Sequence, residues 1–147
     1  MYNRILLAAF IAWFLAQFSK AVIYGIINKK FSWERFCGDG GMPSSHTAIV
    51  MSMATITGLQ QGWDSPLFAI AAVLALIVMH DAMGVRQETG KQAKVINNML
   101  KLFESMGRGD LTPENALKEF VGQTRRQVTV GAFLGILVGV IMHNILP

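Results

Sequence analysis

Four apolar stretches, each bounded by polar or charged residues, constrain this chain more than any other feature. They cover residues 5–27, 46–59, 67–83 and 128–146. A helix needs about 20 apolar residues to cross the hydrocarbon core of a bilayer. The first and last stretches reach that length, whereas the second needs its flanking residues to do so. The pattern predicts an all-α, polytopic membrane helical bundle with four transmembrane helices.

The composition agrees with a membrane protein. Of the 147 residues, 52% are hydrophobic and only 15% are charged, with a mean hydropathy of +0.41. Such values predict one integral membrane domain over residues 1–147, with much of its apolar surface facing lipid. The single cysteine, Cys37, excludes an internal disulfide and a cysteine-cluster zinc site.

The basic residues are distributed unevenly between the connecting segments. Of the 13 Lys and Arg residues, three lie between the first two stretches and eight between the last two. By the positive-inside rule both segments are cytoplasmic. The net charge of +4 then reflects the orientation of the protein in the membrane, and we expect no nucleic-acid partner. We expect the protein to reside in a bacterial inner membrane, with its functional site on the cytoplasmic side.

This topology brings the polar ends of all four stretches to one side of the membrane. The residues concerned are Lys20, Ser44, Ser45, His46, His80, Asp81, Arg125 and Arg126. Ionisable residues within spans are costly and are usually paired or functional. Structural interpretations are also open for Lys20, Asp81 and the nearby Arg86: Lys20 can snorkel to the interface, Asp81 can pair with Lys20 or Arg86, and Arg86 can serve topology alone.

A glycine, proline and serine motif precedes the second stretch. Residues 40–46 read Gly-Gly-Met-Pro-Ser-Ser-His. Glycine lets the backbone approach a ligand closely, proline suits the first turn of a helix, and Ser44 or Ser45 can cap exposed N–H groups. Such a helix start attracts anions, above all phosphate. Since it lies at a membrane boundary, we expect the ligand to be a phosphorylated lipid.

The segment between the third and fourth stretches predicts one or two interfacial helices. Arg86, Gly90, Ala93 and Asn97 recur at helical spacing along one face, where small residues permit close helix contact. A second, short amphipathic helix is expected over residues 113–120, because Thr112 and Pro113 form a typical helix start.

Four motifs occur in a specific combination. They are GGMPSSHTA at 40–48, DAMGVR at 81–86, GKQA at 90–93 followed by Asn97, and LKEFVG at 117–122. Together they resemble the divergent branch of the type 2 phosphatidic acid phosphatase family, which is related to acid phosphatases and vanadium-dependent haloperoxidases. The resemblance covers essentially the whole chain. It implies an all-helical membrane protein that acts on phosphate esters or anhydrides.

The resemblance also implies roles for individual residues. In the wider superfamily, a basic residue on an early helix and a Pro-Ser-Gly-His motif bind phosphate, and a later arginine precedes a nucleophilic histidine. Lys20, the Ser44-Ser45-His46 run and Arg86 match these in order. The nucleophile has no match, because Gln92 stands six residues after Arg86. Where relatives of this branch often carry Gly-His-Thr, this chain has Gln123 in place of the histidine.

Two mechanisms can bypass the missing histidine. In the first, His46 attacks phosphorus or activates water, Asp81 orients the imidazole, and Lys20 with Arg86 neutralises the developing charge. In the second, Asp81, alone or together with Asp39, holds Mg²⁺, which polarises the phosphate and positions water. We favour the first, which needs no metal or cofactor.

The predicted site therefore has two sets of residues. The predicted catalytic residues are His46, Asp81 and Arg86, and the predicted substrate-binding residues are Lys20, Ser44, Ser45, Gln92 and Asn97.

The predicted function is hydrolysis of a lipid phosphate or lipid pyrophosphate, with phosphatidic acid, phosphatidylglycerol phosphate and polyprenyl pyrophosphate as candidate substrates. The alternative is a catalytically inactive, lipid-phosphate-binding or scaffold protein that retains the anion pocket. Gln92 and Gln123 favour that alternative. The predicted partners are the lipid substrate, membrane lipids and a second copy in a homodimer. Gly131, Gly135 and Gly139, four residues apart, form either a dimer face or an internal packing seam.

Overall fold

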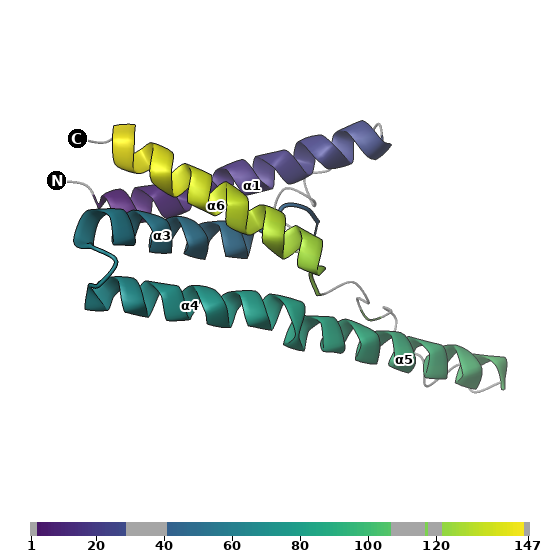
Figure 1. Cartoon of the computed structure of the whole chain (residues 1–147). Coiled ribbons are helices and arrows are strands. Elements are labelled where there is room, and N and C mark those ends of the chain that lie inside the picture. The colour runs from purple at the N-terminus through teal and green to yellow at the C-terminus, as the bar shows by residue number, and fades with distance from the viewer. Residues whose placement is uncertain (1–2, 29–40, 107–116, 118–121, 146–147) are drawn as a thin grey trace.

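The computed structural model describes residues 3–28, 41–106, 117 and 122–145. Over these residues it contains five helices and no strand (Figure 1). The helices are α1 (Arg4–Asn28), α3 (Ser45–Gln61), α4 (Pro66–Met83), α5 (Val85–Ser105) and α6 (Arg125–Ile145). The predicted all-α membrane bundle is confirmed.

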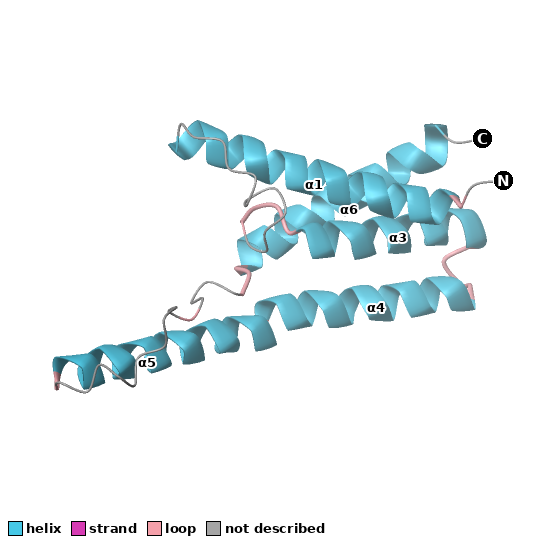
Figure 2. Cartoon of the chain, turned by 180° about the vertical axis from the view of Figure 1, so that it is seen from behind, coloured by secondary structure: helices cyan, strands magenta, loops and turns pink. Residues whose placement is uncertain are grey.

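Helix α3 is the centre of the bundle. It contacts α1, α4 and α6, and Figure 2 shows α1 and α6 crossing close to it. The core joins small residues of α1 (Ala8, Ala12 and Ala16) to Ala48 and Ile56 of α3. Because lipid is as apolar as these side chains, helices in a membrane associate through close packing, and small residues permit it.

The closest packing joins α3 to α6. A Cβ atom on Gly131 would lie 2.5 Å from the Ser44 carbonyl oxygen, and one on Gly135 would lie 2.5 Å from the Ala48 carbonyl oxygen. A Cβ on Gly139 would lie 2.8 Å from the Cβ of Thr55. The glycine ladder of α6 is therefore an internal packing seam. The homodimer stays a prediction and does not rest on this ladder.

Within the described part of the chain, three segments are long and apolar enough to cross a membrane: residues 4–27, 66–105 and 125–145. Helix α3, with 17 residues, is about 25 Å long at the usual helical rise. It is shorter than these three segments, and it contacts the helices α1, α4 and α6 that belong to them. The predicted count of four spans is not confirmed, whereas the membrane-spanning character of the bundle is.

The helices α4 and α5 form one extended rod. Gly84 separates them, and α5 continues in the direction of α4 beyond the rest of the bundle (Figures 1 and 2). On one face of α5, Gly90, Ala93 and Asn97 are buried. The Asn97 side chain donates to the Leu117 carbonyl at 2.9 Å and accepts from the Leu117 N–H at 3.0 Å. The small-residue face of α5 therefore receives the returning chain. The short helix predicted at 113–120 falls outside the described residues.

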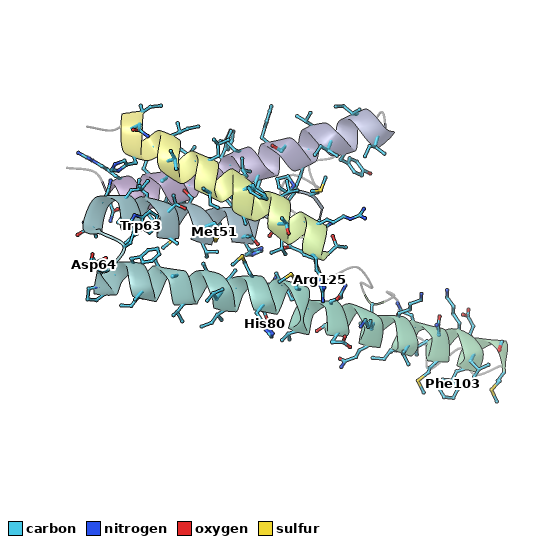
Figure 3. The ribbon with its side chains drawn as sticks, in the orientation of Figure 1. Met51, Trp63, Asp64, His80, Phe103 and Arg125 are labelled. Atoms are coloured by element: carbon cyan, nitrogen blue, oxygen red, sulfur yellow. The ribbon has the colours of Figure 1, made fainter. Side chains whose placement is uncertain are left out.

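The turn from α3 to α4 lies at the opposite end from the α4–α5 junction. Gly62 has a φ of +91°, which favours glycine. The Ser65 hydroxyl accepts from the Phe68 N–H at 3.2 Å and caps α4. Trp63 meets the Phe68 ring edge to face, with centroids 4.9 Å apart (Figure 3).

The α3–α6 seam predicts that Gly135→Ala lowers stability. The added methyl group would meet a backbone carbonyl, so one helix must shift, at a cost of about 1–3 kcal/mol. Gly25→Ala in α1 is the matched control, because a Cβ there meets nothing within 4 Å. Alanine's greater helix propensity should leave that variant equally stable or more stable. The free energies of unfolding in detergent, followed by circular dichroism, measure the difference. Equal effects of the two changes would contradict the seam.

Candidate functional site

Lys20 is buried within the bundle, with 5% of its surface exposed. Its ammonium group donates to the Gln17 side-chain oxygen at 2.9 Å and to the Ser45 hydroxyl at 2.9 Å. A buried ammonium is costly unless hydrogen bonds compensate its lost hydration. The lysine is therefore held in place rather than directed to the interface, and it joins α1 to the first residue of α3.

The first turn of α3 is capped by Ser44. Its hydroxyl accepts from the Thr47 N–H at 3.2 Å and donates to the Thr47 hydroxyl at 2.9 Å. The Ser44 N–H donates to the Gln127 carbonyl of α6 at 3.0 Å. Of the two serines that the sequence offered as caps, Ser44 is the cap and Ser45 is a partner of Lys20. Both are buried.

The backbone at Gly41 closes over the lysine. Gly41 has a φ of +92°, which favours glycine, and a Cβ atom there would lie 3.8 Å from the aliphatic carbons of Lys20. His46 follows Ser45 as the second residue of α3 and is partly exposed. The dipole of a helix start makes this an electropositive place. We call Lys20, Ser44, Ser45 and His46 the lysine–serine cluster.

Asp81 and Arg86 form an ion pair across the α4–α5 junction. The Arg86 Nε atom donates to an Asp81 carboxylate oxygen at 3.1 Å. Both side chains are partly exposed, so the pair contributes at most about 1 kcal/mol of stability. Of the two partners considered for Asp81, the structure shows a bond to Arg86.

The helix ends that carry the lysine–serine cluster and the Asp81–Arg86 pair lie at one end of the bundle. The C-terminal half of α1, the first turns of α3 and α6, and the α4–α5 junction all lie there (Figures 1 and 2). Gln92 is exposed farther along α5. Asn97 lies beyond it and binds the backbone of Leu117.

Two polar contacts at this end were not anticipated. Gln17 lies one helical turn before Lys20 and accepts a hydrogen bond from its ammonium group, and the spacing of three residues in an apolar stretch was the available signal. Thr124 and Gln127 form a capping box at the start of α6. The Thr124 N–H donates to the Gln127 side chain at 2.7 Å, and the Gln127 N–H donates to the Thr124 hydroxyl at 3.4 Å. The Thr-x-x-Gln spacing is the known signature of this cap.

The described part of the chain holds no group of three or more His, Cys, Asp or Glu side chains that could bind a metal ion. Asp39, the second carboxylate considered for Mg²⁺ beside Asp81, lies outside that part, as does Cys37.

The contact between Lys20 and Ser45 predicts an energetic coupling. In a double-mutant cycle of Lys20→Met and Ser45→Ala, the two changes should be non-additive by about 1–3 kcal/mol, because either one removes the same charge-assisted bond. Lys20→Met with Ser44→Ala is the control cycle, since the Ser44 hydroxyl bonds to Thr47. Unfolding free energies in detergent measure both. Additivity in the first cycle would show that the bond carries no stability.

The chain is similar to a known protein family and to a bacterial membrane protein. The family described as "Divergent PAP2 family" matches residues 1–138. The uncharacterized membrane protein YuiD of Bacillus subtilis (strain 168) is 36% identical over 148 residues, covering 95% of this chain and 94% of that protein. No solved structure matches the chain. The resemblance inferred from the four motifs is confirmed, and the chain belongs to the Divergent PAP2 family.

Proposed function

We propose that this protein hydrolyses the phosphate or pyrophosphate group of a lipid at the membrane interface. The observation that supports it best is the buried Lys20 ammonium, hydrogen-bonded to Ser45 at the start of α3. A fixed cation beside a helix N-terminus suits a phosphate group. Membership of a PAP2-related family supports the same reaction class.

In the proposed reaction His46 serves either as nucleophile or as base. As nucleophile, an imidazole nitrogen bonds to phosphorus while the bond from phosphorus to the leaving oxygen breaks, and water then hydrolyses the phosphohistidine. As base, His46 takes a proton from water; the hydroxide oxygen bonds to phosphorus as the bond to the leaving oxygen breaks, and the His46 imidazolium returns the proton to that oxygen. In both routes Lys20 and the N–H groups of α3 stabilise negative charge on the phosphate oxygens. In this reaction Asp81 orients the imidazole, and Arg86 also neutralises the negative charge that develops on the phosphate oxygens.

An apolar cavity supports a lipid as the substrate. It has a volume of about 490 Å³ and lies between α3, α4 and α6, and its lining includes Met51, Trp63, Phe68 and Ile136. Figure 3 shows Met51 and Trp63 on the α3 side of this region. Such a lining suits an acyl or prenyl chain, since it offers almost no polar atoms.

The proposal predicts that His46→Gln lowers the rate of phosphate release roughly 10²–10⁴-fold. His143→Gln is the matched control, because His143 lies in the last turn of α6 at the opposite end and should leave the rate within about twofold. Phosphate release by purified protein from phosphatidic acid, phosphatidylglycerol phosphate and polyprenyl pyrophosphate measures both variants. Activity that survives a chelator supports the metal-free route, and loss on chelation supports Mg²⁺. Equal rates for His46→Gln and the wild type would contradict the role of His46.

The inactive, lipid-phosphate-binding protein is the second candidate. Its support is that Gln92 and Gln123 stand where the resemblance implies histidine, and an amide nitrogen is not a nucleophile of that kind. Saturable binding of the same lipids without turnover, lost in Lys20→Met, would favour this candidate.

We also propose that the lysine–serine cluster faces the cytoplasm of a bacterial cell. In a Cys37→Ser background, a cysteine at Asp64 should react with a membrane-impermeant maleimide applied to whole cells, because Asp64 is exposed in the turn at the opposite end. A cysteine at Ser105, at the far end of α5, should react only after lysis. The reverse labelling pattern would overturn the orientation.

A further inference from the structure

A cavity with polar side chains in its lining lies between the α4–α5 junction and the start of α6. Its volume is about 470 Å³, and it is lined by His80, Met83, Gly84, Gln87, Gln123, Thr124 and Arg125. None of the residues of the lysine–serine cluster lines it, nor do Asp81 and Arg86. Figure 3 labels Arg125 at the start of α6 and His80 near the end of α4.

Backbone contacts fix the walls of this cavity. The Gln123 N–H donates to the Ala82 carbonyl at 3.1 Å, which joins the entry to α6 to the last turn of α4. Gly122 lies against the first turn of α5 so closely that a Cβ atom there would come within 2.5 Å of the Gln87 nitrogen. The capping box of Thr124 and Gln127 sets the first turn of α6. Contacts within the fold therefore hold the backbone on both sides of the cavity.

The lining has the chemistry of an anion site. Arg125 supplies a cation at the first residue of α6, and Thr124, Gln87 and His80 add hydrogen-bonding groups. No lining residue that the structure describes is acidic. The start of α6 adds its own partial positive charge.

Gln123 gives the independent indication of a ligand. It is 5% exposed, and its side-chain oxygen is buried without a hydrogen-bond partner among the residues that the structure describes. An unpartnered buried acceptor is destabilising, so it is found where a ligand or water completes the bond. The missing partner is a donor. A phosphate group with a protonated oxygen or an adjacent hydroxyl supplies that donor together with the charge that Arg125 binds.

We infer that this cavity, with Arg125 and Gln123 as its principal contacts, binds a phosphate-bearing ligand that also donates a hydrogen bond. The site is separate from the lysine–serine cluster. The first turn of α6 lies between them, since the Gln127 carbonyl binds Ser44 while Arg125 and Gln123 line the cavity. Binding here does not require that the protein hydrolyse anything.

Isothermal titration calorimetry on the full-length protein in nanodiscs of uncharged lipid tests the inference by measuring ligand affinity. The probes are inorganic phosphate and a short-chain phosphatidic acid. Arg125→Gln should weaken binding about tenfold or more, because a charge-assisted bond is lost. Arg126→Gln, the neighbouring arginine that does not line the cavity, is the matched control and should change the affinity less than about twofold.

Gln123→Leu separates the ligand contact from a purely structural role. This change removes the unpartnered oxygen at similar volume, so the thermal stability of the ligand-free protein should stay equal or rise while phosphate affinity falls. If Arg125→Gln does not fold, the phosphate affinity of Gln123→Leu still tests the inference. A loss of stability together with unchanged affinity would overturn the role of Gln123.

Repeating the titration with Lys20→Met distinguishes this site from the proposed active site. In Lys20→Met, the phosphate binding that depends on Arg125 should persist, and this expectation holds even if the protein has no hydrolase activity. Binding of both probes would identify phosphate alone as the ligand, and binding of phosphatidic acid only would identify a lipid head group. No saturable binding of either probe, or equal losses in Arg125→Gln and Arg126→Gln, would overturn the inference.

Discussion

The close approach of α3 and α6 is the contact on which the rest of the structure depends. Within a bilayer, burial of apolar side chains gives helices little reason to associate, so shape and hydrogen bonding must hold them together. The glycines of α6 bring its axis against the backbone of α3. At the end of the same seam, the Ser44 N–H reaches the Gln127 carbonyl. The seam therefore fixes where α3 begins, and with it the position of Ser45 opposite Lys20.

Much of the fold was predictable because the bilayer imposes simple rules. Long apolar stretches gave α1, α4 and α6, and the Gly-Pro-Ser motif gave the capped start of α3. The continuity of α4 and α5 was less accessible, since Gly84 looks like a break in sequence, yet both helices continue on either side of it. The pairing of Asn97 with Leu117 depends on a return of the chain over 20 residues, which local spacing cannot reveal.

The candidate site was predictable as a set of helix ends, but not as a set of contacts. Loop charges indicated which ends share a side of the membrane, and the helices do meet there (Figure 1). Which side chains pair depends on rotation of each helix about its axis, and hydropathy does not determine that rotation. Asp81 thus had two possible partners in sequence and pairs with Arg86. Gln123 looked like a lost histidine, whereas the fold gives it a buried position of its own.

The brevity of α3 has a consequence for access. Helices α1 and α6 and the α4–α5 rod all extend past its first turn (Figures 1 and 2), and the Ser44 and Ser45 side chains in that turn are buried. In the proposed reaction, a head group that reaches Ser45 must therefore shed its water and displace the side chains that cover this residue. Under that proposal, burial of the first turn favours phosphates with little bulk around the phosphorus atom.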